Sequence, residues 1–309
     1  MKLALVFPGQ GSQSVGMMQG FVDNRIVRDT FEEASRALGQ DLWQLVAEGP
    51  AEELSATVNT QPVMLTAAYA MYRAWEEAGA PRPEMVAGHS LGEYTALVVA
   101  GALSFADAVP LVRFRAQAMQ EAVPMGTGAM AAILGLDDDA VRAACAEAAQ
   151  GEIVEPVNFN APSQVVIAGH KSAVERGAAV AKARGAKRAL MLPVSAPFHS
   201  SLLRPAADRL RERMQGITFS ATTIRVINNV DVAIACDPAQ IKDALARQAC
   251  NPVRWVETVR AFAVQGVTHV VECGPGKVLS GLTRRIENSL QGFAVTDPAS
   301  LQQTMEALK

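Results

Sequence analysis

Apolar residues along the chain fall into short runs that polar and glycine-rich turns separate. Residues 2–7 form one such run and end at a glycine-rich turn, which predicts a buried strand leading into a functional loop. Strong helix formers at residues 63–78 follow Pro62 and predict a helix. A short strand at 84–88 and an apolar helix at 91–102 come next. The order strand, helix, strand, helix predicts an α/β sheet.

The segment at residues 126–194 has a different order of elements. Its pattern predicts strands at 129–136, 153–159, 164–168 and 188–194, with helices at 138–149 and 172–184. This βαββαβ order is that of a ferredoxin-like unit. We therefore expect a small inserted subdomain at 126–194 and a large domain made of residues 1–125 and 195–309.

The remaining C-terminal part returns to alternating helices and strands. The pattern predicts helices at 205–215, 238–249 and 256–263, and strands at 223–228 and 267–272. Half of the residues are hydrophobic and only 5% are aromatic. Small aliphatic side chains must therefore build the core, which suits buried parallel strands and their covering helices.

Charge and cysteine usage exclude several classes of protein. The 28 Lys and Arg against 31 Asp and Glu give a net charge of -3, without the basic excess of nucleic-acid-binding proteins. The four cysteines are scattered and have no zinc-ligand spacing, so we expect no metal site and a reduced, cytoplasmic protein. No run of 18 apolar residues occurs, so we expect no membrane segment.

A serine between two glycines carries the first chemical signal. Residues 88–92 fit G-x-S-x-G, in which a serine sits on a sharp strand-to-helix turn. The bare pattern arises by chance in roughly one chain of this length in ten, but here it lies between an apolar strand and an apolar helix, as the motif requires. We predict that Ser90 is a nucleophile. The main-chain amides of Leu91 and of Gln10, in the turn after the first strand, are the expected oxyanion donors.

A serine nucleophile needs a base, and the chain has four histidines. His89 neighbours the serine and should turn away from it, while His170 and His269 fall at or within predicted strands. His199 lies in an irregular, proline-containing junction between the two predicted domains, where clefts tend to form. By elimination, His199 is the predicted base.

An arginine suggests what the nucleophile acts on. If residues 111–123 are helical, Arg115 shares a face with Leu111, Val112 and Met119 and points toward the apolar side. An arginine in such a place can simply extend along the edge of the core. Alternatively, its planar guanidinium binds a carboxylate at the floor of a cleft and selects dicarboxylic acyl groups.

Six motifs together resemble the malonyl-CoA:acyl carrier protein transacylases over essentially the whole chain. They are the segments at residues 7–13, 88–94, 119–124, 126–130, 157–160 and 272–277. The resemblance implies a large α/β-hydrolase-like domain with a mostly parallel sheet and a ferredoxin-like insert. It also implies ping-pong transfer of malonyl from malonyl-CoA, through Ser90, to the phosphopantetheine thiol of acyl carrier protein, as in fatty acid biosynthesis. No further cofactor is implied, and we expect a monomer.

The resemblance also assigns roles to individual positions. It matches Gln10 and Leu91 to the oxyanion donors, Arg115 to the carboxylate clamp and His199 to the base. Gln248 matches the position whose main-chain carbonyl orients that histidine. Asn160 matches a residue near the active site, and Phe198 matches a phenylalanine that crowds out branched acyl groups. Because carrier proteins of this family are acidic, basic residues are candidates for docking: Lys187, Arg188, Lys277, Arg284 and Arg285.

Three other functions stay open from the residues alone. A serine hydrolase would use the same serine and histidine but would not need Arg115. A non-catalytic module that binds carrier protein would not need Ser90 and His199 together. An acyltransferase for another extender unit, such as methylmalonyl, is disfavoured by the role that the resemblance assigns to Phe198.

Overall fold

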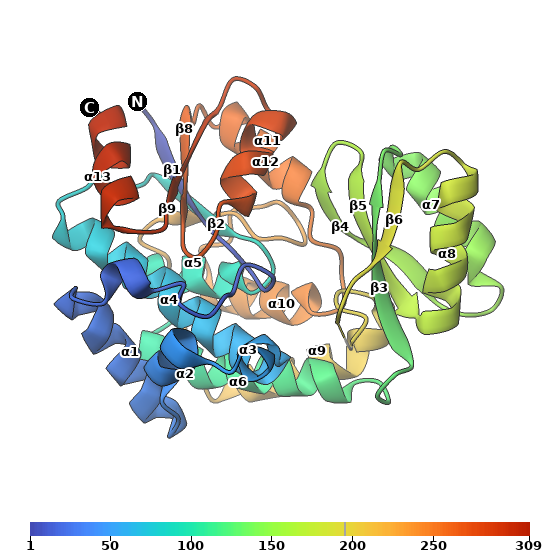
Figure 1. Cartoon of the computed structure of the whole chain (residues 1–309), viewed down its shortest axis with the longest axis horizontal. Helices are drawn as coiled ribbons and strands as arrows, with labels where there is room; N and C mark the ends of the chain where they lie inside the picture. The colour runs from blue at the N-terminus through green and yellow to red at the C-terminus, as the bar shows by residue number, and fades with distance from the viewer. Residues whose placement is uncertain (195) are drawn as a thin grey trace.

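The computed structural model describes residues 1–194 and 196–309, which contain two separate β-sheets (Figure 1). The larger sheet has the strand order β7-β2-β1-β8-β9, and all its pairings are parallel. The prediction of an α/β fold with a parallel sheet is confirmed. Its strands are β1 (Leu3–Phe7), β2 (Met85–Gly88), β7 (Arg225–Val226), β8 (His269–Cys273) and β9 (Gln291–Val295).

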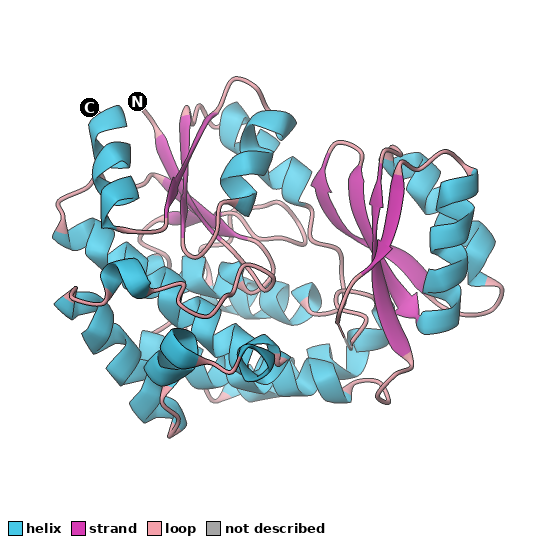
Figure 2. Ribbon diagram, viewed as in Figure 1, coloured by secondary structure: helices cyan, strands magenta, loops and turns pink. Residues whose placement is uncertain are grey.

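Helices cover both faces of this parallel sheet (Figure 2). They are η1 (Gln19–Phe21), α1 (Arg25–Leu38), α2 (Leu42–Glu48), α3 (Ala51–Ser55), α4 (Thr57–Glu77), α5 (Gly92–Val99), α6 (Phe105–Glu121), η2 (Ser201–Leu203), α9 (Arg204–Gln215), α10 (Pro238–Gln248), α11 (Trp255–Val264), α12 (Val278–Ile286) and α13 (Pro298–Ala307). Successive side chains of a strand point to opposite faces. Accordingly, Leu5 and Phe7 belong to the core with α1, α4 and α6, while Ala4 and Val6 belong to the core with α11 and α12.

The smaller sheet is antiparallel and has the order β4-β5-β3-β6. Its elements are β3 (Gly128–Leu134), α7 (Asp138–Ala149), β4 (Val154–Ala161), β5 (Gln164–His170), α8 (Lys171–Ala183) and β6 (Arg188–Met191). This is the predicted ferredoxin-like order. Ala131 and Ile133 face the core beneath α7 and α8, whereas Met130 faces the other way and packs with Phe198. The face without helices is therefore turned toward the candidate site.

The limits of the inserted subdomain stay a prediction. Residue 195, where we expect the chain to return to the large domain, lies outside the described residues. Within the described ranges, none of the helices combines the length and the apolar character that crossing a bilayer requires.

Two helices begin earlier than the sequence pattern predicts. Helix α4 contains Pro62 in its interior, and α6 begins at Phe105 and contains Pro110. Ser104 sets the start of α6, because its side chain accepts a hydrogen bond from the main-chain N of Asp107. An interior proline removes one helical hydrogen bond. The buried faces of α4 and α6 stabilise the two helices in spite of that loss.

Candidate active site

Ser90 lies in a strained turn at the carboxyl end of β2. Its φ of 52° is in the left-handed region, which residues other than glycine rarely adopt. A Cβ added to Gly88 would lie 1.8 Å from the carbonyl carbon of Gly92, and one added to Gly92 would lie 2.1 Å from the carbonyl oxygen of Phe7. Neither position has room for a side chain, which explains why glycine flanks the serine on both sides.

His199 contacts Ser90 directly, although 109 residues separate them in the sequence. The Oγ of Ser90 is 2.7 Å from Nε2 of His199, and Nδ1 of His199 is 2.8 Å from the main-chain carbonyl oxygen of Gln248. A carbonyl can only accept, so Nδ1 carries the proton and Nε2 is free to accept one from the serine. Burial, together with the nearby charge of Arg115, lowers the pKa of His199 to about 3. The imidazole is therefore neutral and available as a base near pH 7.

Arg115 is buried beside the serine, with only 1% of its surface exposed. Its Nη2 donates to the Oγ of Ser90 at 3.1 Å and to Oε1 of Gln248 at 2.9 Å, and its Nη1 donates to Oε1 of Gln61 at 2.9 Å. The guanidinium also lies over the ring of Tyr94. The ion pairs found among the described residues do not include Arg115, and its Nε has no hydrogen-bond acceptor there. The site thus offers a buried cation to an incoming anion.

A small cavity of about 130 Å³ brings these groups together. Its walls are Gln10, Gln61, His89, Ser90, Leu91, Arg115, Met119, Met130, Asn158, Leu192, Val194, Phe198 and His199. Gln10 and Leu91 both line it, because β1 and β2 are adjacent parallel strands whose carboxyl ends meet at one edge. Six of the eight predicted site residues line this cavity, and Gln248 bonds directly to Arg115 and His199 in its wall.

Asn160 does not line the cavity. Its Oδ1 lies 2.8 Å from Nε2 of His89, so it reaches the site only through that histidine. His89 lines the cavity, while its ring bonds to Asn160 and packs against Trp255, and among the described residues no hydrogen bond joins that ring to the side chain of Ser90. The neighbouring Asn158 lines the cavity, and its buried Oδ1 has no partner among the described residues.

The sequence pattern did not single out a buried polar network behind Ser90. Asn229 accepts a hydrogen bond from the main-chain N of Ser90 at 2.8 Å and donates to the carbonyl oxygen of Gly88 at 2.7 Å. Glu93 in turn accepts from the main-chain N of Asn229 at 3.0 Å and from Nε2 of Gln248 at 2.9 Å. Burial raises the pKa of Glu93 to about 7. The sequence did offer one signal for Asn229. It directly follows the strand predicted at 223–228, whose carboxyl end lies at the same edge of the parallel sheet as the turn that carries Ser90.

Two other features complete the surroundings of the site. A larger cavity of about 490 Å³ adjoins His199 on another side and includes Arg142, Glu155 and Arg204 in its wall. Among the described residues, no group of His, Cys, Asp or Glu is placed to hold a metal ion. The polar groups that converge on the small cavity include an alcohol, an imidazole and a guanidinium.

Residues 4–299 match the acyl transferase domain family. The chain is 58% identical, over 97% of both proteins, to the malonyl CoA-acyl carrier protein transacylase of Salmonella typhimurium. It also resembles the crystal structure of an acyl-carrier-protein S-malonyltransferase from Burkholderia pseudomallei, with a TM-score of 0.98 and 66% identity over 99% of this chain and 100% of that one.

A third similar structure contains a partner. It is the complex of a type II polyketide synthase acyl-carrier protein with its malonyl-transacylase. The TM-score is 0.98 and the identity 53%, over 99% of this chain and 100% of that one.

Proposed function

This chain belongs to the malonyl CoA-acyl carrier protein transacylases of the acyl transferase family, and from that premise we propose that it transfers malonyl from malonyl-CoA to the phosphopantetheine thiol of acyl carrier protein. The enzyme is an acyltransferase of fatty acid biosynthesis. The resolved complex of a related transacylase with its carrier protein supports the choice of partner.

One observation carries the proposal: a buried guanidinium lies 3.1 Å from the proposed nucleophile. A buried charge without a counterion is costly. The free carboxylate of a malonyl group supplies the counterion and can accept two parallel hydrogen bonds from Arg115. An acetyl group has no such carboxylate. Arg115 therefore favours a dicarboxylic acyl group on Ser90, and a simple serine hydrolase would gain nothing from it.

The first half of the reaction acylates the serine. His199 Nε2 takes the proton of Ser90 Oγ as that oxygen attacks the thioester carbonyl of malonyl-CoA. The main-chain amides of Gln10 and Leu91 donate to the resulting oxyanion. The C–S bond then breaks, the proton on His199 passes to the departing coenzyme A thiolate, and malonyl-Ser90 remains.

The second half reverses these roles with a different thiol. His199 takes the proton of the carrier's phosphopantetheine thiol, and the sulfur attacks the ester carbonyl of malonyl-Ser90. When the ester bond breaks, Ser90 Oγ recovers its proton from His199. The carbonyl of Gln248 keeps the imidazole in the tautomer that both halves require.

Phe198 and Asn160 are proposed to serve substrate binding. Phe198 narrows the 130 Å³ cavity and disfavours branched extender units such as methylmalonyl. Asn160 acts through His89, which it holds against the cavity.

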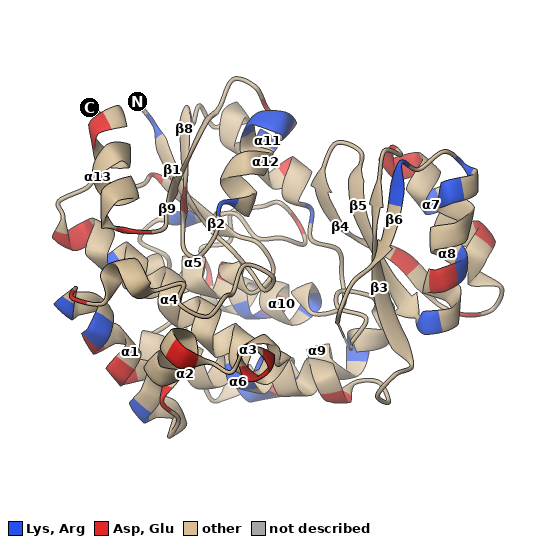
Figure 3. Cartoon of the chain, in the orientation of Figure 1, with Lys and Arg blue, Asp and Glu red and all other residues tan. Residues whose placement is uncertain are grey.

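The carrier-docking surface is proposed to include five exposed basic residues. Figure 3 shows that positive and negative side chains are mixed over the surface, in line with the small net charge, so docking depends on a local patch. The candidates are exposed: Lys187, Arg188, Lys277, Arg284 and Arg285.

The remaining proposals concern the domain limits, the oligomeric state and the cellular compartment. We take residues 1–125 and 195–309 as the catalytic domain and 126–194 as the inserted subdomain. We further propose a cytoplasmic monomer, and the four free cysteines are consistent with a reducing compartment.

Intact-protein mass spectrometry tests the central proposal. Incubation with malonyl-CoA alone should add one malonyl group, carrier protein should remove it as malonyl-carrier, and Ser90→Ala should take up none. A missing adduct, or an adduct that persists in Ser90→Ala, would contradict the proposal. An adduct that water removes as fast as carrier protein does would instead indicate a hydrolase.

A further inference from the structure

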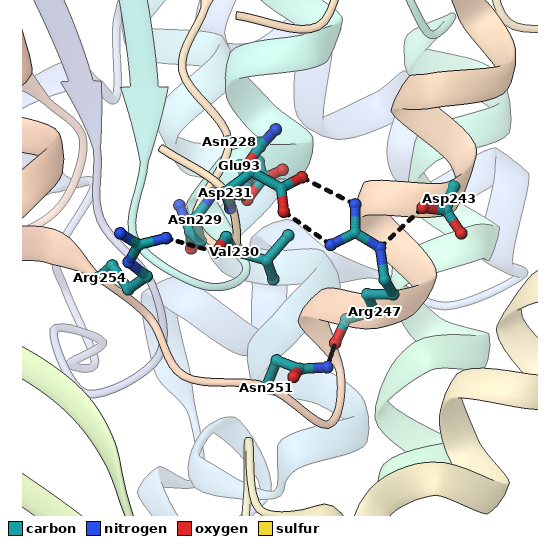
Figure 4. Close-up of polar contacts among 9 residues, drawn as sticks. All are labelled: Glu93, Asn228, Asn229, Val230, Asp231, Asp243, Arg247, Asn251 and Arg254. Carbon is teal, nitrogen blue, oxygen red and sulfur yellow. Dashed lines mark hydrogen bonds and ion pairs between the residues drawn. The ribbon is translucent and has the colours of Figure 1, made fainter. Parts of the chain in front are cut away.

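The loop at residues 228–231 and the end of α10 lie side by side (Figure 4). Each of them binds one member of the proposed catalytic pair. Asn229 of the loop binds the main-chain N of Ser90 and the carbonyl oxygen of Gly88. Gln248, the last residue of α10, binds Nδ1 of His199 through its main-chain carbonyl. Gln248 Nε2 also donates to the carbonyl oxygen of Ser90 at 2.9 Å, and buried Glu93 accepts from both Asn229 and Gln248. The relative position of loop and helix end therefore contributes to the relative position of Ser90 and His199.

An ion pair joins these two elements directly. Arg247 donates to Asp231 through both terminal nitrogens, with Nη1 2.8 Å from Oδ1 and Nη2 2.7 Å from Oδ2. Its Nε donates to Asp243 at 2.7 Å, but Asp243 lies on the same helix, one turn earlier. Of the two carboxylates, only Asp231 connects the helix to the loop.

Further bonds fix each side of this ion pair. The side chain of Asn228 accepts from the main-chain N of Asp231 at 2.7 Å, which closes the loop on itself. Arg254 donates to the carbonyl oxygen of Val230 at 3.1 Å from the other side. Asn251 donates to the carbonyl oxygen of Arg247 at 2.8 Å, which ties the end of α10 to the chain that follows. The ion pair thus connects two segments that are individually well held.

This arrangement matters because the imidazole is oriented by main chain. A side-chain carboxylate could adjust by rotation, but a carbonyl oxygen moves only with the end of its helix. Ser90 is likewise held in a left-handed conformation, partly by Asn229. A small shift between loop and helix would pass directly into the distance between Ser90 Oγ and His199 Nε2.

We propose that Asp231 and Arg247 form a brace that positions Ser90 and His199 for acyl transfer, an inference that rests on the proposed function. Both side chains are partly exposed, at 42% and 37%. Exposed ion pairs contribute little to stability. Catalytic geometry is far more sensitive, since a misplacement of about 1 Å can cost on the order of 100-fold in rate. The brace thus acts on rate more than on folding.

The test compares two isosteric substitutions that each remove one carboxylate from Arg247. Asp231→Asn should slow the formation of malonyl-enzyme in rapid-quench experiments by about tenfold, with the KM for malonyl-CoA within about twofold, because Arg115 and its partners stay in place. Asp243→Asn should react like the wild type. Asp231→Glu, which restores a carboxylate, should recover part of the rate. All rates are measured well below the melting temperature of each variant.

Each outcome has one meaning. Slower acylation in Asp231→Asn alone, with rescue by Asp231→Glu, supports the brace. Equal rates for Asp231→Asn and wild type, or the same loss in Asp243→Asn, would overturn it. So would a loss that appears only as lowered thermal stability. If the wild-type protein itself forms no malonyl adduct, the proposed function fails first, and the two failures are thereby distinguished.

Discussion

The two sheets contribute to the candidate site in different ways. The parallel sheet and its helices supply the polar and ionisable part of the cavity wall, including Ser90, Arg115 and Gln61. The antiparallel sheet and the segment after it supply most of the apolar wall, including Met130 and Leu192, together with Asn158 and the proposed base His199. The comparison teaches that the parallel sheet and its helices carry the nucleophile and the cation, while the antiparallel sheet mainly limits the size of what can react.

The difference has a structural origin. Parallel strands deliver all their carboxyl-terminal loops to one edge, so polar groups from distant parts of the sequence meet there. The antiparallel sheet presents a flat face whose helix-free side is lined by residues such as Met130 and Val166. Substitutions in the first region should therefore change the rate of malonyl transfer and the preference for an acyl group with a carboxylate. Substitutions in the second region should change mainly the size of the acyl group that is accepted.

Removing the cation should cause the largest loss. Arg115→Ala should reduce malonyl transfer by about 100- to 1000-fold, since a desolvated, charge-assisted carboxylate contact is lost. Acetyl transfer should fall much less. Competition between malonyl-CoA and acetyl-CoA, read by mass spectrometry of the acyl-enzyme, measures the ratio. The control is Arg113→Ala, because Arg113 lies two residues away and binds Gln40. Unchanged selectivity between malonyl and acetyl in Arg115→Ala would contradict the claim that Arg115 binds the malonyl carboxylate.

A single methyl group should disrupt the nucleophile turn. Gly92→Ala places a Cβ 2.1 Å from the carbonyl oxygen of Phe7, and the resulting backbone shift should lower the free energy of unfolding by about 3 kcal/mol. Gly281→Ala in α12 meets nothing within 4 Å and should instead stabilise slightly. Urea denaturation of both variants provides the measurement. Equal stabilities would show that the turn is not as constrained as its contacts indicate.

The buried carboxylate behind the serine should make stability depend on pH. Because the pKa of Glu93 is raised from 4.5 to about 7, its stability contribution is fully present below pH 4.5 and is lost as pH rises through 7. Glu93→Gln removes this dependence. The variant should therefore gain stability relative to wild type by about 3 kcal/mol between pH 4.5 and 8. Chemical denaturation across this range tests it, and a pH-independent difference would contradict a buried, titrating Glu93.

The smallest effect is expected at Phe198, in the apolar part of the cavity wall. Phe198→Ala enlarges the cavity next to the proposed acyl site. Transfer of methylmalonyl relative to malonyl should rise by about tenfold, which is typical of pocket discrimination over one methyl group. Phe293→Ala on β9, outside the cavity wall, should leave the ratio unchanged. If Phe198→Ala lowered both rates equally, the wall would serve positioning as well as selectivity.

Local signals predicted some elements well and others poorly. Helix α7 has the predicted bounds, because Asp137 caps its start and Gln150 ends it in a left-handed conformation. Helices α1, α12 and α13 and strand β9 were not predicted. The early starts of α4 and α6 were missed because Pro62 and Pro110 were read as boundaries, although packing keeps both helices intact.

The candidate site likewise contains residues that local sequence signals predicted and residues that they did not. The spacing of glycines around Ser90 predicted its turn, since that constraint is local. Asn229 and Glu93 were not predicted, because their bonds to Ser90 and Gln248 span 139 and 155 residues of sequence. Their roles and those of the predicted catalytic residues now await the tests above.

The sequence by itself determined the class of fold, the strand-turn-helix around the serine and, through its motifs, the family. These depend on periodicity and on steric limits that act over a few residues. Only the tertiary structure decided that His199, Arg115 and Gln248 meet at one serine, that the ring of His89 bonds to Asn160, and that an ion pair joins the two segments behind the serine. Those distances follow from how sheets and helices pack, because residues far apart in the chain become neighbours only when the apolar surfaces between them are buried.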